Sequence, residues 1–299
     1  LTCTTVPHGY VTDTTIWVNV NEIPEAKFIN INACEGTAVR LINNTIIGSG
    51  SLSYEWTLGD NTTAVTTNVN KLYSQPGGYS VTLKATANGC SNSYTKNVYQ
   101  FAKPVANFTK AAGNCENEEF EFENNSTISQ GQFGSYWDFD DAGSKATLDE
   151  PTYDFVTAGT KNVKLKVVSE FGCTDSMVTP TVVKPSSVSD FNFPFACSRT
   201  ATPFNNASFI PAGTSVTSYT WDFGDNTSTT VANPTKSWTS IGPKLVKLTT
   251  LLNNGCTDNV TKELNVGVQP TVAFNVPDQC AGSDVQFTNL TTFPQGDIS

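Results

Sequence analysis

Apolar and polar residues alternate along many short segments of this chain, with the two-residue period of a β-strand. The alternation is plainest at 119–123, which reads Glu-Phe-Glu-Phe-Glu. This predicts a strand with its phenylalanines inward and its carboxylates in water. A second strand is expected from Lys161 to Val168, followed by a Gly-Cys hairpin and a last strand from Met177 to Val183. No window sustains a 3.6-residue period, so the pattern predicts an all-β protein.

A tryptophan recurs three times, each time four residues ahead of an aspartate in a predicted turn. The three are Trp56, Trp137 and Trp221, at sequence spacings of 81 and 84. A tyrosine opens each of these segments: Tyr54, Tyr136 and Tyr219. Such spacing is typical of tandem copies of one domain. Because the tryptophans recur at one position of a strand that must face the opposite sheet, we interpret them as core residues rather than sugar-stacking platforms.

The eight cysteines repeat in two registers. One set steps by 81, 82 and 83: Cys34, Cys115, Cys197 and Cys280. The other steps by 87, 83 and 83, and its last three members each follow a glycine: Cys3, Cys90, Cys173 and Cys256.

These registers divide the chain into repeats. Three whole ones are expected at 23–102, 103–185 and 186–268. The segment 1–22 is interpreted as the last strands of a preceding repeat, and 269–299 as the first strands of a following one. The chain begins without Met and ends about where the next tyrosine and tryptophan are due. We therefore interpret it as a piece of a longer array.

Each repeat holds about seven short strands in roughly 80 residues, separated by turn signals, which predicts an immunoglobulin-like β-sandwich. The joints between repeats are short and lack Gly/Ser spacers, as at 182–185. The expected architecture is therefore a head-to-tail rod of all-β domains.

Composition favours an extracellular protein. Only 15% of residues are charged, and one His and one Met are present. Eight regularly spaced cysteines without a CxxC motif suit disulfides in an oxidising compartment better than a zinc or redox site. A net charge of −10 argues against nucleic acid or an anionic membrane as partner. No apolar run is long enough for a membrane helix.

The pairing of the cysteines has two alternatives. The simpler one joins cysteines within a repeat: Cys34 to Cys90, Cys115 to Cys173, and Cys197 to Cys256. In an immunoglobulin-like domain, however, the first-strand turn and the last hairpin lie at opposite poles, roughly 23 Å apart, whereas a disulfide needs Cα atoms within about 7 Å. We favour pairs between neighbouring repeats: Cys34 to Cys173 and Cys115 to Cys256. The other four would then pair outside this chain.

The acidic turns are the main candidates for chemistry. Asp138 and Asp140 lie two residues apart, as a glycosidase carboxylate pair could, and together with Asp141 they offer oxygen ligands for calcium. Turn formation by Asp is the simpler interpretation, since its side chain bonds nearby backbone amides. His8 is interpreted as a hairpin-tip residue. Without a Ser/His/Asp arrangement or a metal cluster, we predict no enzyme activity and no cofactor.

Several asparagines stand in Asn-x-Ser/Thr triplets. Four fall nine residues after a cysteine of the first set: Asn43, Asn124, Asn206 and Asn289. A repeated turn explains them without a glycan. Thr14 and Ser176 follow an aspartate and resemble the Bacteroidota O-glycosylation pattern, which makes them O-glycan candidates.

The segment Tyr219-Thr220-Trp221-Asp222-Phe223-Gly224-Asp225-Asn226, with Asn233-Pro234, Trp238 and Gly242 after it, resembles the PKD domain, an immunoglobulin-like module. The first repeat departs from the pattern with Thr57-Leu58, and the second with Asp140-Asp141 in place of Gly-Asp. Arrays that contain cysteines and a Gly-Cys-Thr-Asp hairpin are similar to those of giant Bacteroidota surface proteins, including SprB-like gliding-motility adhesins exported by the type IX system.

The resemblance implies a structural stalk or filament segment of a large secreted bacterial cell-surface adhesin, without a role in catalysis. Its partners would be neighbouring repeats, and surface glycans or other surface proteins. The alternative is an accessory substrate- or glycan-binding module of a secreted hydrolase, which should expose aromatic residues outside the repeat pattern. A polycystin-like ectodomain, with occupied N-glycans, is a third interpretation.

Overall fold

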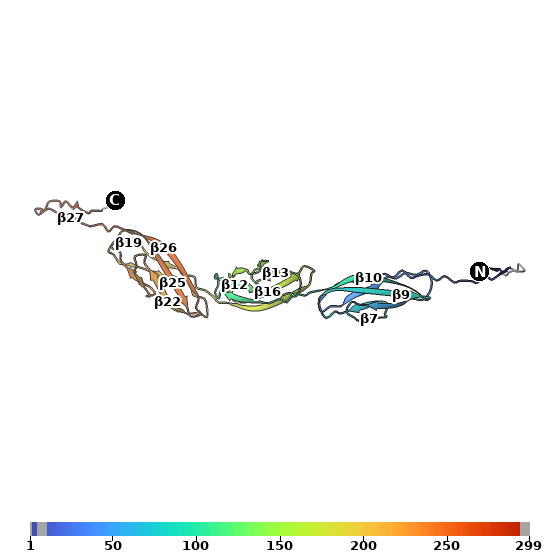
Figure 1. Cartoon of the computed structure of the whole chain (residues 1–299). Coiled ribbons are helices and arrows are strands. Elements are labelled where there is room, and N and C mark those ends of the chain that lie inside the picture. Colours follow the sequence, from blue (N-terminus) through green and yellow to red (C-terminus); the bar gives the residue numbers. More distant parts are fainter. Residues whose placement is uncertain (1, 5–10, 294–299) are drawn as a thin grey trace.

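Three β-sandwiches follow one another in a row, with a short hairpin at each end of the chain (Figure 1). The computed structural model describes residues 2–4 and 11–293. All regular structure in this part of the chain is β. No helix among the described residues is long and apolar enough to cross a membrane. The predicted all-β array of immunoglobulin-like domains is confirmed.

The first sandwich packs a three-stranded sheet against a five-stranded one. The smaller sheet has the order β3 (Phe28–Ile31), β5 (Val39–Asn43), β8 (Val69–Lys71). The larger has the order β4 (Ala33–Cys34), β10 (Cys90–Phe101), β9 (Gly77–Ala87), β6 (Ser53–Thr57), β7 (Thr63–Ala64).

The second sandwich repeats this plan with a four-stranded larger sheet. Its smaller sheet is β11 (Phe108–Ala112), β12 (Glu119–Asn124), β15 (Thr152–Asp154). Its larger sheet is β14 (Lys145–Ala146), β13 (Phe133–Asp138), β16 (Gly159–Ser169), β17 (Thr174–Val183).

The third sandwich has five strands in its larger sheet: β19 (Ala196–Cys197), β26 (Thr257–Gly267), β25 (Gly242–Leu252), β22 (Val216–Asp222), β23 (Ser228–Thr229). Two pairs lie opposite: β18 (Phe191–Asn192) with β21 (Asn205–Asn206), and β20 (Thr202–Pro203) with β24 (Thr235–Lys236). The end hairpins are β1 (Thr2–Thr4) with β2 (Val11–Asp13), and β27 (Phe274–Asn275) with β28 (Thr288–Asn289).

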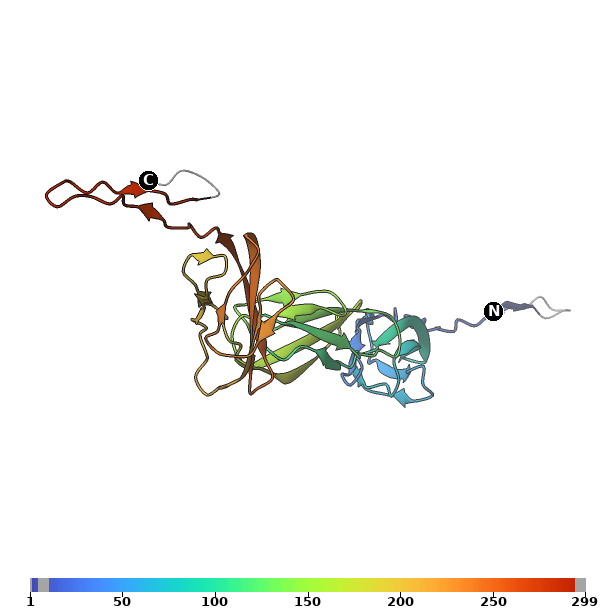
Figure 2. The same cartoon turned by 90° about the vertical axis from the view of Figure 1, so that its left-hand side faces the viewer.

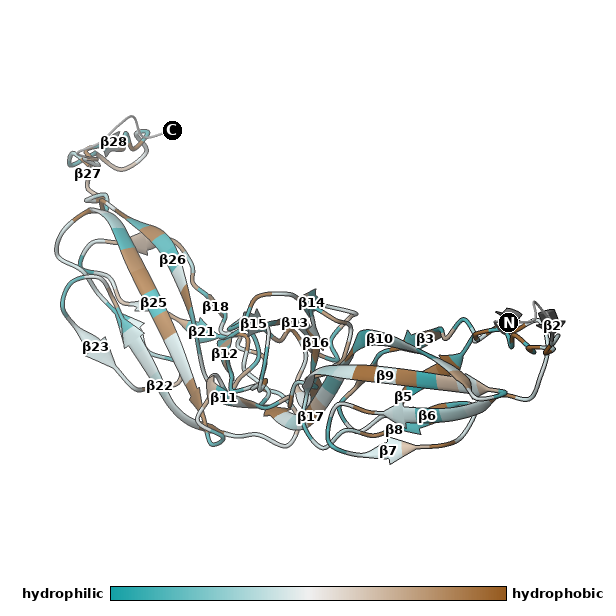
Figure 3. Ribbon diagram, turned by 45° about the vertical axis from the view of Figure 1, so that its right-hand side comes forward, coloured by the Kyte–Doolittle hydropathy of each residue, from teal (hydrophilic) through white to brown (hydrophobic). Residues whose placement is uncertain are grey.

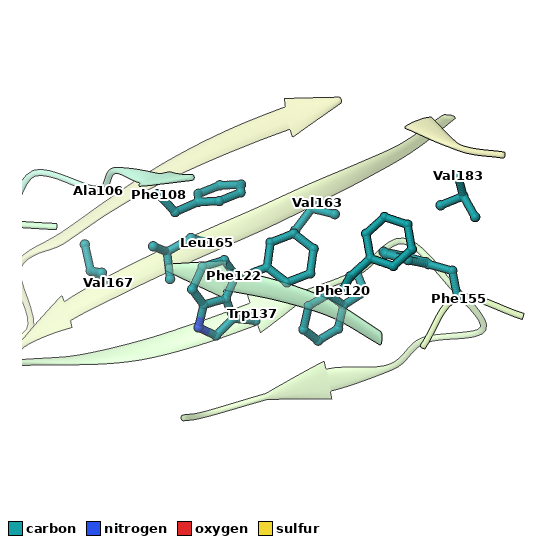
Figure 4. Packing of buried hydrophobic residues seen from close by; sticks show 11 residues of the cluster. Ala106, Phe108, Phe120, Phe122, Trp137, Phe155, Val163, Leu165, Val167 and Val183 are labelled. Atoms are coloured by element: carbon teal, nitrogen blue, oxygen red, sulfur yellow. The ribbon is translucent and has the colours of Figure 1, made fainter. Parts of the chain in front are cut away.

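Each sandwich has its own core, built on the inward side of strands that alternate in hydropathy, as β9 and β25 do in Figure 3. The three tryptophans are at most 1% exposed. In the second domain Phe120 and Phe122 point from one sheet toward Val163 and Leu165 of the other (Figure 4). Separate cores mean that only the joints connect the domains mechanically.

Successive domains do not share one orientation. In Figure 2 the orange strands of the third domain stand nearly upright, whereas the green and yellow strands of the second run across the view. The direction of the rod therefore changes at the second joint.

A short parallel strand decides where the first set of cysteines lies. In the first domain β4 runs parallel to the end of β10, so that Cys34 is paired with Phe101. Cys115 is likewise bridged to Lys184, and Cys197 is paired with Gly267. Each of these cysteines therefore sits at the pole where the chain leaves its domain.

Candidate functional site: the joints between domains

A disulfide bond crosses each joint between two whole domains. Cys34 is bonded to Cys173 with their Cα atoms 5.7 Å apart, and Cys115 to Cys256 with theirs 5.8 Å apart. The first cysteine of each pair lies at the exit pole of one domain, and the second lies in the last hairpin of the next. This is the arrangement between neighbouring repeats that we favour on the basis of the distance between the two poles of a domain.

The alternative within single repeats, namely Cys34–Cys90, Cys115–Cys173 and Cys197–Cys256, differs from the structure. Cys34 is paired with Phe101 at the end of β10, whereas Cys90 is the first residue of that strand. Cys34 and Cys90 therefore lie at opposite ends of β10. They are separated by about 36 Å at ~3.3 Å per residue. A bond of that reach is impossible without unfolding the strand.

Three further cysteines, Cys90, Cys197 and Cys280, have no disulfide partner among the described residues. Cys90 lies in the last hairpin of the first domain, where Cys173 and Cys256 are bonded in theirs. Cys197 lies at the exit pole of the third domain, where Cys34 and Cys115 are bonded in theirs. Each of these two therefore occupies the position of a cysteine that is bonded in another domain.

A second contact recurs at the joints, between two positions that we call the joint pair. The first member lies seven residues before the inward phenylalanine that opens the next domain, and the second lies two residues before the hairpin cysteine. The three joint pairs are Asn21 with Asn88, Phe101 with Phe171, and Lys184 with Asn254.

The chemistry of the joint pair changes while the contact persists. Phe101 and Phe171 stack, with ring centroids 4.2 Å apart. Lys184 Nζ donates to the Asn254 carbonyl oxygen at 3.0 Å, and Asn254 Nδ2 donates to the carbonyl oxygen of Pro185 at 2.8 Å. Asn21 Nδ2 donates to the Asn88 carbonyl oxygen at 2.9 Å. Sequence reasoning missed these contacts because the residue types differ from joint to joint, although the two sequence positions recur in every repeat.

An aspartate then anchors the entering chain to the next domain. Asp175 accepts a hydrogen bond from the Ala106 N–H at 2.9 Å, and Lys103 in the joint lies 3.1 Å from its other oxygen. The Ala106 N–H is the main reason that the pKa of Asp175 is lowered, and Lys103 adds to the effect. Asp258 accepts in the same way from the Ser189 N–H. These are the aspartates of the Thr-Asp pairs that follow two of the hairpin cysteines.

Glu116 holds the chain at the second joint. Its carboxylate accepts from the Ser186 N–H at 3.0 Å, and its backbone carbonyl accepts from the Ser186 hydroxyl at 3.3 Å. Its other carboxylate oxygen accepts from the Ala158 N–H of its own domain. One side chain therefore connects the body of the second domain to the segment that enters the third.

A family model described as the PKD domain matches residues 21–100, 101–184 and 191–268. This chain belongs to the PKD domain family. It contains three tandem PKD domains.

Solved PKD domains are among the similar structures. The PKD1 domain of Vibrio anguillarum Epp is 26% identical, covering 28% of this chain and 96% of its own, with a TM-score of 0.26. The PKD1 domain of the Vibrio cholerae metalloprotease PrtV is 28% identical over 27% of this chain and 96% of its own, with a TM-score of 0.25. A structure from a 1.5-MDa bacterial ice-binding adhesin is 9% identical, covering 83% of this chain and 99% of its own, with a TM-score of 0.30.

The turn aspartate after each tryptophan pairs with a lysine of its own PKD domain. Asp60 lies 2.6 Å from Lys71, and Asp225 lies 2.7 Å from Lys236, which is at the equivalent position. Burial is the largest single influence on the pKa of Asp225 and would raise it. The hydrogen bonds and charge of Lys236, with Thr227, outweigh burial and leave the pKa lowered.

In the second PKD domain the turn aspartate is Asp141, and it is also paired with a lysine, but that lysine lies at a different position. Tyr153 occupies the position of the two lysines and donates to Asp141 at 3.2 Å. The ammonium comes from Lys161 on β16, 2.9 Å away. Asp141 is 5% exposed and the Lys161 side chain is 12% exposed, so this ion pair is largely shielded from water.

The calcium hypothesis for Asp138, Asp140 and Asp141 is not supported by this geometry. Asp138 accepts from the backbone of Asp140, and Asp140 accepts from the backbone of Asn162. Asp141 is neutralised by Lys161. Each carboxylate thus has a different partner, and no group of three acidic, His or Cys side chains in the described part of the chain is arranged to hold a metal ion.

Asp140 also takes an unusual backbone conformation for a residue with a side chain. Its φ is 55°, where the equivalent glycines of the other PKD domains, Gly59 and Gly224, have φ of 82° and 70°. The turn thus keeps the left-handed geometry of the Gly-Asp pattern. The Asp140 carboxylate accepts a hydrogen bond from the Asn162 N–H, which a glycine at this position could not do.

Tyr136 differs from the other tyrosines that precede a tryptophan. Tyr54 and Tyr219 stand two residues before the tryptophan and pack against the cores of their domains. Tyr136 is one residue before Trp137, and it therefore points to the other face of the sheet, where it is 50% exposed. Ser135 takes the inward position and is buried. Tyr136 is thus an exposed aromatic residue outside the repeat pattern.

The asparagines of the Asn-x-Ser/Thr triplets form the expected turns. The Oδ1 atom of each accepts a hydrogen bond from the N–H two residues on, in Asn43, Asn124, Asn206 and Asn289 alike, at 2.8–3.0 Å. The O-glycan candidates Thr14 and Ser176 are both exposed. His8 lies outside the described residues.

Proposed function

We propose that this chain is a segment of the stalk of a large secreted bacterial cell-surface adhesin, in which cross-linked PKD domains hold a distal region away from the cell. The proposal assigns it no catalytic role. The observation that carries the proposal is the pattern of disulfides, which connect each domain to the next at the joint rather than closing a loop inside one domain.

This pattern produces two interleaved covalent paths along an array. Each path is made of several stretches of the chain. A stretch begins at the hairpin cysteine of one domain, follows the last strand of that domain across the joint, and ends at the exit-pole cysteine of the next domain. Three such stretches lie wholly within the described residues: 90–115, 173–197 and 256–280. They are nearly equal in length, and each runs along two domains and crosses the joint between them. In a fully cross-linked array, disulfides would connect these stretches end to end.

Such an array would be almost inextensible. More than half of the residues in each stretch are already in β-strands at ~3.3 Å per residue, and a polypeptide reaches at most ~3.6 Å per residue. Unfolding the inner strands of a domain, such as those within 115–173, would therefore lengthen the array by much less than the contour length of those strands. An array without the disulfides would lengthen by most of the contour of each unfolded domain. A stalk under tension benefits from the first behaviour.

Single-molecule pulling from the two ends of this chain tests the proposal. Among its described residues this chain contains only one bond of each interleaved path, so its shortest covalent path does run through 115–173. The two bonds remove 34–115 and 173–256 from that path, so reduction should add roughly 160 residues, or about 58 nm at ~3.6 Å per residue. A chain in which Cys34, Cys115, Cys173 and Cys256 are serines should match the reduced protein. An oxidised chain that reaches the full reduced length would refute the proposal.

The same proposal includes a location at the cell surface, a role in gliding motility and export by the type IX system. The sequence that flanks this chain is needed to test these three points. A type IX sorting domain beyond this chain would support the adhesin, and micrographs of the parent protein should show an extended filament. A compact parent protein would contradict it.

An accessory module of a secreted hydrolase is the second candidate. Tyr136 favours it, because an exposed aromatic residue outside the repeat pattern is what a substrate-engaging module needs. Retention of the chain on an insoluble polysaccharide, lost in Tyr136→Ala and kept in Tyr99→Ala, would support this candidate. Tyr99 is a suitable control because it is also exposed, at 44%, but lies in another domain.

A further inference from the structure

The second domain carries opposite charges on its two outer sheet faces. Lys145, Lys164 and Lys166 project from the sheet that contains β13 and β16, and all three are exposed. Glu119, Glu121 and Glu123 project from β12 in the other sheet, and they are exposed as well. We call these the lysine face and the glutamate face.

No lysine or glutamate of the two faces forms an ion pair within the described part of the chain. The ion pairs there involve other lysines and other carboxylates. Asp138 lies between Lys145 and Lys164 on the lysine face without a close contact to either. Asp154, which is paired with Glu119 across the strands, adds a fourth carboxylate to the glutamate face. Among the described residues, the one side chain bonded to a carboxylate of the three glutamates is Thr109, which donates to Glu123 at 3.2 Å.

The other two domains lack both faces. At the positions of the three lysines the first domain has Thr63, Thr82 and Lys84, and the third has Ser228, Lys247 and Thr249. At the positions of the three glutamates they have Ala38, Arg40 and Ile42, and Ala201, Pro203 and Asn205. The fold therefore does not require these charges, because its cores and turns form without them.

We propose that the lysine face of one chain binds the glutamate face of a second copy of this chain, so that the rods associate side by side. Residues two apart on one strand project from the same face about 7 Å apart. Lys164 and Lys166 on β16 therefore have the same spacing as successive glutamates on β12. The hollow of about 440 Å³ that Tyr136 and the three lysines line leaves the lysine face accessible.

The two faces lie on opposite sides of one sandwich, so the contact is heterologous. Each copy that uses its lysine face still presents its glutamate face, and the association does not close. It should therefore extend beyond a dimer into a layer or bundle of rods. An acidic polysaccharide would also fit the lysine face, but it would leave the glutamate face without a role, whereas a second copy accounts for both.

Sedimentation velocity of the oxidised chain, with unpaired thiols alkylated, tests the proposal. At ~0.1 M salt the mass should rise above 32.1 kDa with concentration and continue past the dimer. It should return to the monomer value near 1 M salt, where the Debye length falls to about 3 Å. Reversal of either face, by Lys145, Lys164 and Lys166→Glu or by Glu119, Glu121 and Glu123→Lys, should abolish association.

A mixture of the two reversed variants is the decisive sample. One variant has two acidic faces and the other two basic faces, so each should stay monomeric alone and the mixture should associate. Lys27, Lys96 and Lys247→Glu is the matched control, because it changes the net charge equally in the outer domains and should leave association intact.

Several outcomes would overturn the proposal. The chain could stay monomeric up to ~1 mM, or it could form a closed dimer. Association could survive the reversal of one face, or the two reversed variants could fail to associate when mixed. A monomeric chain whose lysine face binds polygalacturonate would assign that face to an acidic polysaccharide instead. The pulling experiment is unaffected by any of these results, because it reads one molecule at a time.

Discussion

Phe101 and Phe171 lie in different domains, yet their rings stack with an interplanar angle of 9°. A disulfide lies beside this contact. Phe101 is paired with Cys34 across the sheet, and Phe171 is two residues before Cys173. The bond between the two cysteines therefore adjoins the joint pair, and at the second joint the other bond adjoins Lys184 and Asn254 in the same way.

Loss of the aromatic joint pair should loosen the first joint without unfolding either domain. Phe171 is 56% exposed, so Phe171→Ala removes little from a core. We expect a coupling of about 1 kcal/mol between Phe101 and Phe171 in a double-mutant cycle, and a broader distribution of interdomain orientations in small-angle X-ray scattering. Phe195→Ala is the control, since Phe195 is fully exposed in another domain. A coupling near zero would contradict a stabilising role.

Peptide mapping of the non-reduced protein should yield one peptide pair that contains Cys34 and Cys173, and another that contains Cys115 and Cys256. A peptide that links Cys34 to Cys90 would contradict the arrangement across joints. The bonds join cysteines 139 and 141 positions apart, and for loops of this size chain entropy alone suggests a stabilisation of about 5 kcal/mol each. Reduction should therefore lower the unfolding temperature of the second domain, which has both bonds.

The buried pair of Asp141 and Lys161 should make the second domain sensitive to acid. Burial is the largest influence on the pKa of Asp141 and would raise it, but Lys161, the Val156 N–H and Tyr153 together lower it. With a folded pKa below its unfolded value of about 3.9, this carboxylate stabilises the domain above that pH. The contribution is lost as the pH falls through the folded pKa.

Replacement of Asp141 tests the same pair at neutral pH. Asp141→Asn should cost about 3 kcal/mol, since it leaves the ammonium of Lys161 buried without its counter-charge. Hydrogen exchange measured on peptides of β13 and β16 reads this domain alone. Asp154→Asn, on an exposed residue of the same domain, should change stability by less than about 0.5 kcal/mol. Equal effects of the two substitutions would refute the role of the pair.

Gly224 should not tolerate a side chain. Its φ is +70°, and a Cβ atom would lie 2.6 Å from the carbonyl oxygen of Leu245. Gly224→Ala should therefore destabilise the third domain by about 2–3 kcal/mol, which combines backbone strain with a clash against backbone. Gly213→Ala is the matched control, because Gly213 has a φ of +79° in open space and should cost only about 1 kcal/mol. Hydrogen exchange on β22 and β25 measures both variants.

Register decided where sequence reasoning succeeded and where it failed. The alternation at 119–123 predicted a strand, and the structure has β12 there with Phe120 and Phe122 buried. Tyr136 looked equivalent to Tyr54 and Tyr219, but it is offset by one residue. Because side chains of a strand alternate between faces, that offset moves Tyr136 from the core side to the solvent.

Local periodicity and spacings that recur with each domain were enough to predict the repeat, the all-β fold and the burial of Trp56, Trp137 and Trp221. The folded arrangement was needed to find the joint pairs, the partners of Asp138, Asp140 and Asp141, and the lysine face opposite the glutamate face. Each of these depends on which side chains from distant strands meet. That is set by strand register and by the approach of one domain to the next, and the residue types that make these contacts differ from domain to domain.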